Sequence, residues 1–367
     1  MHCDIIIPIW NQLKYTEECI ESILEATGFS SFRLILIDNA SDRQTADYLD
    51  QIKAGHEGKI LLIRNSENLG WVKAVNQGIC RCVGEYVCVM NNDTVVYPGW
   101  LAQMIKVAEK EKAIGLVNPL WQLPKRFKKI PGAYFNKTIK KGRGEFIETD
   151  WVRGFCFLIK RAVLDKIGGL DEDFSPGYYD DWDFSMRAQR AGFKCARAKG
   201  AFVRHYVNAS SPLILGRKGF NRLFQEKEEL FYSKWGRPLR ILVIIDRALS
   251  KDFASVKSFT SQLLKEQNRV FLISQRPLGI AHTNYRYNNC PDFLIGVRAL
   301  FSLLNNLRHI RSKRYNLIFC STRMGRLLKS FPFIRNNYLF KELDGCLKDT
   351  EATIEELAAL KKGKTDN

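Results

Sequence analysis

The sequence has 367 residues, and its 57 Lys and Arg against 39 Asp and Glu give a formal net charge of +18. A hydrophobic fraction of 46% and an aromatic fraction of 12% exclude a mainly disordered or fibrous chain. The length predicts about two domains, and no uncharged apolar run approaches the ~20 residues that a membrane-spanning helix needs.

The cysteine pattern and the N-terminus indicate a cellular compartment. Ten cysteines are scattered without a Cys-x-x-Cys pair, which argues against a zinc site and against a disulfide framework. The short apolar stretch at the N-terminus is interrupted by Asp4, so we expect no leader peptide. These features predict a reduced, cytoplasmic protein.

Strand-like and helix-like segments alternate along the first third of the chain. The expected strands are Asp4–Ile9, Leu34–Ile37, Lys59–Ile63 and Tyr86–Met90, and the expected helices are Thr16–Ala26, Arg43–Ala54 and Trp71–Arg81. Repeated strand–helix units predict a parallel sheet with right-handed crossovers. Ligands bind such sheets at the carboxyl ends of the strands, where Asp38 and Asn91–Asp93 fall.

The pattern then changes at Trp121–Asp150, a stretch rich in Pro, Gly and Lys that we interpret as a functional loop or lid. Beyond it we expect regular structure to resume at Trp151–Lys160, followed by helices near Arg161–Ile167 and Asp183–Ala191, a strand at Ala201–His205 and a helix at Phe220–Trp235. Gly236-Arg237-Pro238 is the predicted domain boundary.

After this boundary we expect a small basic α/β domain over residues 237–348. Its strands are Arg240–Ile245, Val270–Ser274 and Tyr315–Cys320, with an amphipathic helix at Ser255–Gln267. It contains neither Gly-x-Gly-x-x-Gly nor a Walker loop. Residues 349–367 are expected to form a polar helical tail.

The positive charge is concentrated in two stretches. Residues 293–339 contain no Asp or Glu, and a second basic cluster comprises Lys125, Arg126, Lys128, Lys129, Lys137, Lys140, Lys141 and Arg143. Solvated faces would account for both. The alternative is an anionic partner such as phosphates, nucleic acid or an anionic membrane surface.

Two strand ends carry candidate binding residues. A carboxylate at Asp38 can accept the imide N–H of uracil or thymine, whereas the plainer interpretation is a helix cap at Asp38, Ser41 or Asp42. Asp93, in Asn91-Asn92-Asp93-Thr94, is a suitable ligand for Mg²⁺ or Mn²⁺ beside a diphosphate. Its alternative is an ordinary turn.

The densest acidic cluster is Tyr179-Asp180-Asp181-Trp182-Asp183. Adjacent carboxylates repel each other's ionised forms, which raises a pKa and suits a general base. Acids also gather in the first turn of a helix, which is the alternative. His205 ends a predicted strand and is either structural or a ligand that suits Mn²⁺.

In their order and spacing these residues resemble the family-2 glycosyltransferases of the GT-A fold, including a rhamnosyltransferase-like group. The resemblance covers about residues 3–235. It is carried by segments that are weak singly: Pro8…Asn11, Asp38-Asn39-Ala40-Ser41, Asn68-Leu69-Gly70, Asn91-Asn92-Asp93-Thr94, Gly168-Gly169-Leu170-Asp171, Asp180-Asp181-Trp182-Asp183 and His205.

The resemblance implies a fold and roles for these residues. The fold is a mostly parallel sheet flanked by helices, with the C-terminal domain weakly resembling half of a two-Rossmann-domain glycosyltransferase. The nucleotide sugar would be bound by Pro8, Asp38, Asn68, Gly70, Asn91 and Asn92. Asp93 and His205 would hold a divalent cation, and Asp181, paired with Asp180, would be the catalytic base.

Two residues depart from the family pattern. Asn91 stands where the metal motif has its first acid, so the cation has one negative ligand fewer. Asp180 replaces the Glu of a Glu-Asp pair and keeps its charge.

The sequence therefore predicts an inverting, metal-assisted glycosyltransferase. Its donor would be a UDP- or dTDP-linked sugar, and its acceptor a hydroxyl of a growing cell-surface glycan, a lipid-linked glycan or a protein. The alternative is a non-catalytic sugar-nucleotide or glycan-binding protein on the same fold. No recognised motif supports nucleic-acid binding. The acid-free stretch adds the hypothesis of peripheral docking on the inner face of a membrane.

Overall fold

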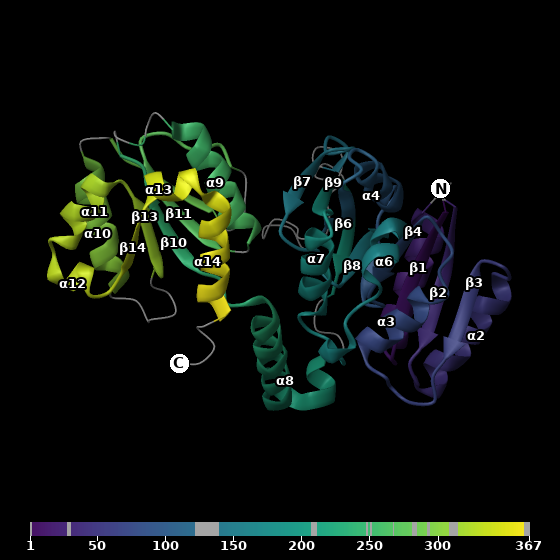
Figure 1. Ribbon diagram of the computed structural model, residues 1–367. Coiled ribbons are helices and arrows are strands. Elements are labelled where there is room, and N and C mark those ends of the chain that lie inside the picture. Colours follow the sequence, from purple (N-terminus) through teal and green to yellow (C-terminus); the bar gives the residue numbers. More distant parts are fainter. Residues whose placement is uncertain are drawn as a thin grey trace. The chain divides into compact units, whose positions relative to one another are not determined.

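The computed structural model describes residues 2–27, 31–121, 139–206, 211–246, 249, 252–266, 268–280, 285–291, 294–307 and 315–362, with only the backbone for 211–215 and 362. The chain divides into two compact units, Met1–Phe231 and Tyr232–Asn367 (Figure 1). Within the described ranges, none of the helices has the length and apolar character needed to cross a bilayer.

The N-terminal unit alternates strands and helices as far as its fourth strand. These elements are β1 (His2–Ile9), α1 (Leu13–Ala26), β2 (Ser31–Asp38), α2 (Arg43–Gly55), β3 (Ile60–Arg64), α3 (Trp71–Ile79) and β4 (Tyr86–Met90). The second half comprises β5 (Thr94–Val96), α4 (Trp100–Ala108), β6 (Ile114–Leu120), β7 (Phe146–Thr149), β8 (Cys156–Lys160), α6 (Arg161–Ile167), η2 (Glu172–Phe174), α7 (Asp180–Arg190), β9 (Lys194–His205) and α8 (Ser211–Trp235), which is kinked at Gly216.

Nine strands form one mixed sheet in the order β3-β2-β1-β4-β8-β6-β9-β5, with β7 also paired to β9. The strands β1 to β4 run parallel, β8 is antiparallel to both its neighbours, and β6 pairs with β9 in parallel. The predicted α/β class with helices flanking a sheet is confirmed, but the sheet is mixed rather than mostly parallel, because β5, β7 and β8 pair with their neighbours in antiparallel fashion. The parallel strands are buried because helices cover both faces.

Two hydrophobic cores lie on the two faces of this sheet. The first joins the sheet to α1, α2 and α4 through Ile20, Leu49 and Trp100. The second joins it to α3, α6 and α7 through Val75 and Phe184, among others. Burial on both faces accounts for the near-continuous apolar sequence of β1 and β2.

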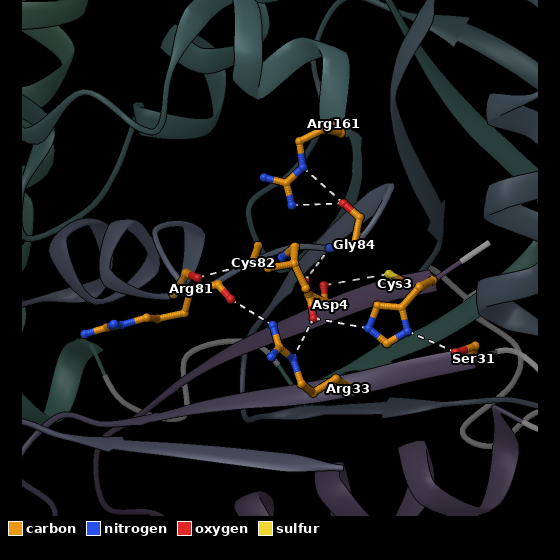
Figure 2. A network of polar contacts seen from close by, with 11 residues as sticks. Cys3, Asp4, Ser31, Arg33, Arg81, Cys82, Gly84 and Arg161 are labelled. Carbon is orange, nitrogen blue, oxygen red and sulfur yellow. Dashed lines mark hydrogen bonds and ion pairs between the residues drawn. The ribbon is translucent and has the colours of Figure 1, made fainter. Parts of the chain in front are cut away.

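A network around Asp4 fixes the amino-terminal ends of β1 and β4 (Figure 2). The fully buried Asp4 carboxylate accepts hydrogen bonds from the Val83 and Gly84 N–H groups at 2.7 and 2.8 Å and from Arg33 Nε at 2.9 Å. Arg161 in turn donates to the Gly84 carbonyl. This carboxylate therefore orders the sheet at the edge opposite the strand ends that carry the candidate site.

The C-terminal unit is a second α/β layer structure. Its elements are β10 (Arg240–Ile244), α9 (Phe253–Lys265), β11 (Arg269–Ser274), β12 (Tyr285–Asn289), α10 (Ile295–Leu307), β13 (Leu317–Cys320), α11 (Thr322–Lys329), α12 (Pro332–Arg335), β14 (Leu339–Glu342), α13 (Leu343–Lys348) and α14 (Thr350–Lys362). Five parallel strands lie in the order β12-β11-β10-β13-β14. One core packs α9, α13 and α14 on the sheet, and a second packs α10, α11 and α12.

Several predicted elements have different bounds in the structure. The strand expected at Ala201–His205 begins at Lys194, and the helix expected at Asp183 begins at Asp180. The C-terminal sheet has two strands more than the sequence indicated, β12 and β14, which are short and only partly buried. Of the predicted lid, residues 122–138 lie outside the described residues, and β7 occupies part of the rest.

Candidate functional site

The candidate residues gather at the carboxyl ends of the central strands. Pro8 pairs with Ile37 and Ile9 with Asp38, so the ends of β1 and β2 are level. β4 lies on the other side of β1, in parallel, and Asn91 follows its last residue. Because neighbouring parallel strands end at one edge, the sheet brings together residues that are more than fifty positions apart in the sequence.

Asp38 is buried and its carboxylate already has partners. One oxygen accepts the Ser41 N–H at 3.0 Å, and the other lies 3.3 Å from Nε of Arg64. The helix cap expected at Asp38, Ser41 or Asp42 is Asp42, whose side chain accepts the Thr45 N–H, so Asp38 is not used for capping. A carboxylate has about four lone-pair sites, and two remain for a ligand N–H.

Asn39, which sequence reasoning did not assign, holds the Asn68–Gly70 turn beside Asp38. Its amide donates to Asn68 Oδ1 at 2.8 Å and its carbonyl oxygen accepts the Leu69 N–H at 3.0 Å. Gly70 has φ 81°, and a Cβ atom there would lie 2.7 Å from Cβ of Pro176. Only glycine lets this turn approach the loop that precedes the acidic helix.

Trp71, also unassigned from sequence, fixes the orientation of Asn91. Its indole N–H, which can only donate, lies 3.1 Å from Asn91 Oδ1. The amide nitrogen of Asn91 therefore faces Nε2 of His205, at 3.5 Å. In the tautomer with its proton on Nδ1, His205 accepts from this amide and presents Nε2 as an electron pair.

Asp93 faces the same imidazole nitrogen. Its Oδ1 lies 3.2 Å from His205 Nε2, yet this buried oxygen has no hydrogen-bond partner. Two electron-pair donors at this separation suit a shared cation, since adjacent ligands of an octahedral ion with bonds of about 2.1 Å lie about 3.0 Å apart. The residues present therefore fit a divalent cation. The described residues contain no cluster of three His, Cys, Asp or Glu side chains suited to a metal, so a cation here would need ligands from a bound molecule.

Asp180 and Asp181 form the first turn of α7. Burial and the charge of Asp181 raise the pKa of Asp180 well above its ordinary value. Burial also raises the pKa of Asp181, against the Gly154 and Trp182 N–H groups and the Arg153 charge, which lower it. Asp181 is the more exposed of the two, and each of its oxygens accepts one backbone N–H. The Asp181 carboxylate therefore keeps lone pairs that can accept a proton from a bound molecule.

The segment Gly154-Phe155 connects the two acidic clusters. The Gly154 N–H donates to Asp181 Oδ2 at 2.8 Å, and the Phe155 carbonyl accepts the Asn91 N–H at 2.9 Å. The ring of Phe155 stacks on His205 with a centroid distance of 4.9 Å. One short segment thus sets the spacing between the carboxylate pair of α7 and the Asp93–His205 pair.

Other residues of the recognised segments have structural roles. Asp183 is fully buried and pairs with Arg187 at 2.8 Å, which also donates to the Ile167 and Gly169 carbonyls. Asn76 exchanges two hydrogen bonds with the backbone of Leu170. Asn92 is buried and donates to Thr16. These contacts dock the loop before α7 and the end of β4 without pointing to a ligand.

Comparisons with known proteins give a consistent family. Residues 4–168 match the sequence model of the family described as Glycosyl transferase family 2. An uncharacterized protein of Sinorhizobium fredii is 25% identical over 56% of this chain and 24% of its own length, and the glycosyltransferase GlyG of Streptococcus pneumoniae is 25% identical over 50% and 52%. The chain thus spans about half or less of these relatives.

Solved structures give a weaker likeness. A mannosyltransferase of Pyrobaculum calidifontis, solved with GDP-Man and Mn²⁺, is 18% identical, with a TM-score of 0.49 over 63% of each chain.

Proposed function

From the match of residues 4–168 to glycosyl transferase family 2, we propose that the chain transfers a sugar from a nucleotide diphosphate sugar to a hydroxyl acceptor. The observation that carries the proposal is the convergence of three groups at one sheet edge. These are the buried carboxylate of Asp38, the Asp93–His205 pair and the Asp180–Asp181 pair.

The donor end of the site would lie at Asp38. Its carboxylate would accept the imide N–H of a uracil or thymine base, which favours a UDP- or dTDP-linked sugar. Pro8, Asn68 and Gly70 shape this end, because the Asn39 contacts place their turn beside it. Asn91 would line the path from the base towards the diphosphate, whereas Asn92 would hold the end of β4 through its bond to Thr16.

A divalent cation, Mg²⁺ or Mn²⁺, would be held by Asp93 and His205. When bound, it supplies a Lewis acid that neutralises the departing diphosphate. Asp93 contributes the single carboxylate of this set, since Asn91 is neutral and directs its amide nitrogen towards His205. The residues thus provide two cation ligands and leave the others to the donor.

Asp181 would act as the general base. It would remove the proton of the acceptor hydroxyl as that oxygen attacks the anomeric carbon on the face opposite the diphosphate, which inverts the configuration. The Gly154 N–H holds its carboxylate in place at 2.8 Å. Burial and the charge of Asp181 raise the pKa of Asp180, so Asp180 would hold a proton and would not add a negative charge beside Asp181.

A donor panel tests this function. UDP, dTDP, GDP and CDP sugars are added to the full chain with and without Mn²⁺, and thermal stabilisation and release of the nucleoside diphosphate are followed. We expect Mn²⁺-dependent stabilisation by a uridine or thymidine donor, with slow donor hydrolysis. Asp181→Asn should keep the stabilisation and lose about 10²-fold or more of the hydrolysis. Equal hydrolysis by this variant would contradict the assignment.

The neutral Asn91 favours a second candidate, a non-catalytic sugar-nucleotide or glycan-binding protein. This candidate predicts that a donor stabilises the chain and that no diphosphate is released, whichever acceptor of a broad glycan panel is added. Release with any acceptor that depends on Asp181 excludes it.

We further propose that the C-terminal unit docks on an anionic membrane surface. Leu294, Val297 and Phe301 are 40%, 50% and 59% exposed, on the side of α10 opposite its buried residues. On the neighbouring helices Leu327 and Phe333 are 51% and 43% exposed. A Cβ atom at Gly296 would lie 3.3 Å from Leu327, so α10 and α11 pack against each other and their apolar residues adjoin.

Basic side chains accompany this apolar face. The exposed ones are Arg298, Arg323, Arg326, Lys329 and Arg335, and residues 293–339 contain no Asp or Glu. Apolar side chains together with Arg and Lys match the acyl boundary and the anionic headgroups of a bilayer. A surface of this kind would bring the enzyme to a lipid-linked acceptor.

A further inference from the structure

Two arginines lie against one tryptophan near the acidic helix. The guanidinium carbon of Arg153 is 4.7 Å from the ring centroid of Trp121, and that of Arg197 is 4.4 Å from it. Asn118 explains the convergence, because its side chain accepts the Arg153 N–H at 2.7 Å while its backbone pairs with Arg197 across β6 and β9.

Neither guanidinium has a hydrogen-bond or ion-pair partner among the described residues. Nε of Arg197 is buried and unpartnered, and burial, together with the neighbouring Arg153 charge, lowers the pKa of Arg197. Residues 122–144 contain no Asp or Glu, so this adjoining stretch of sequence adds only positive charge. Arg153 is exposed and Arg197 is partly buried, so the cost of an unpaired charge falls on Arg197, and a bound anion would relieve that cost.

The pair lies on the side of the general base. Arg153 directly precedes Gly154, whose N–H holds Asp181, and the Arg153 charge lowers the pKa of Asp181. Trp121 packs on Phe155 at 5.8 Å, and Phe155 separates it from His205. Asp38, at the donor end, is across the sheet on β2, whereas Arg197 is on β9.

We propose that Arg153 and Arg197 bind an anionic group, a phosphate or a carboxylate, that the acceptor carries close to its reacting hydroxyl. The inference rests on the proposed transfer reaction and names the chemistry of its acceptor. The planar guanidinium groups offer paired N–H donors that match the oxygens of either anion. The same chemistry is present in the donor's diphosphate, so the experiment has to separate the two sources.

The test compares anionic with neutral probes on the full chain. Glycerol 3-phosphate and glucuronate are titrated against glycerol and glucose at constant ionic strength, without nucleotide, and binding is read from the melting temperature and by calorimetry. We expect the anionic probes to bind at least tenfold more tightly than the neutral ones. Arg153→Gln and Arg197→Gln should each abolish most of this preference. Equal binding of anionic and neutral probes, or no binding of either, overturns the proposal.

A second arm identifies the source of the anion. UDP with Mn²⁺ is titrated into the same variants, and we expect its affinity to change less than about threefold. A tenfold loss of UDP affinity in Arg153→Gln assigns the pair to the donor and overturns the proposal. A wild-type chain that binds no nucleotide contradicts the proposed function instead, and the anion titration remains readable by itself.

Matched variants separate ligand binding from folding. Lys141→Gln removes an exposed cation of the basic cluster that ends at Arg143, outside the Arg153–Arg197 pair, and should leave anion binding unchanged. Because Arg197 is an uncompensated charge, Arg197→Gln should melt at the wild-type temperature or above in anion-free buffer, whereas a purely structural stack on Trp121 would lower it. Arg153 is exposed, so Arg153→Gln tests the proposal even where the Arg197 variant fails to fold.

Discussion

The indole N–H of Trp71 donates to Oδ1 of Asn91 at 3.1 Å, and this bond fixes the orientation of the Asn91 amide. It turns the amide nitrogen towards Nε2 of His205, which lies 3.2 Å from Oδ1 of Asp93 in the proposed cation site. Asn91 stands at the first acidic position of the metal motif in the family that the sequence resembles, so the proposed site has one negative charge fewer.

Asn91→Asp should therefore strengthen cation binding. The new carboxylate can still accept the Trp71 N–H, and its second oxygen takes the place of the amide nitrogen beside His205. We expect the Mn²⁺ concentration for half-maximal stabilisation with UDP to fall roughly tenfold, because ligand charge tunes cation affinity. Asn92→Asp is the control, since the amide of Asn92 donates to Thr16. An unchanged Mn²⁺ requirement in Asn91→Asp would place the cation elsewhere.

Two buried carboxyl groups predict opposite pH effects on stability. Burial and the charge of Asp181 raise the pKa of Asp180, so the folded chain holds a proton there that the unfolded chain releases above about pH 4. Its contribution to the free energy of unfolding falls as the pH rises from about 4 through the folded-state pKa. Asp180→Asn removes this loss, and we expect it to melt above the wild type at pH 7 and near it at pH 4.

Asp4 gives the opposite dependence. Burial alone would raise its pKa, but hydrogen bonds from the Gly84 N–H and from Arg33 lower it below its ordinary value. It stabilises the fold above about pH 4 and loses this effect as the pH falls through the folded-state pKa. We expect Asp4→Asn to reduce the free energy of unfolding by about 3 kcal/mol at pH 7 and by less at pH 3. Denaturant unfolding at both pH values measures the free energy of unfolding. If Asp4→Asn and Asp180→Asn change it with the same dependence on pH, both assignments are contradicted.

Gly70 should be irreplaceable for a backbone reason. Gly70→Ala puts a Cβ atom 2.7 Å from Pro176 at a residue with φ 81°, so the turn that carries Asn68 must shift. We expect a loss of about 2 kcal/mol or more in the free energy of unfolding, together with weaker UDP binding. Gly55→Ala, in the last turn of α2 with nothing within 4 Å of the new atom, should be neutral or stabilising. Equal effects of the two substitutions would refute the close approach at Gly70.

The sequence indicated the strand ends because polar residues follow apolar runs there, and Asp38, Asn91 and Asp93 could be assigned in this way. The acidic pair on α7 was found from its charge density. Trp71 and Phe155 could not be found, since their roles depend on packing across elements that are distant in the sequence. For a related reason, the sequence could not reveal that the charge of Arg197 is uncompensated. It becomes evident only when the partners available to its guanidinium are known.

The apolar face of the C-terminal unit gives the last prediction. Phe301 and Val297 project from α10 away from its buried Ala299, beside Arg298. Replacing both apolar residues with Ser removes the part that enters the acyl boundary and keeps the charge, whereas Arg298→Gln weakens the attraction to headgroups by about 1 kcal/mol, or roughly fivefold.

We expect the double Ser variant to lose most binding to vesicles of phosphatidylglycerol and phosphatidylcholine, measured by co-sedimentation, with its melting temperature unchanged. Val83→Ser, at an apolar residue of the N-terminal unit with 79% exposure, should bind as the wild type does. Wild-type binding that persists on pure phosphatidylcholine at high salt would show that charge plays no part, because surface attraction to anionic lipid is screened by salt. That result would leave the basic residues of this face unexplained and would reject the anionic membrane as its partner.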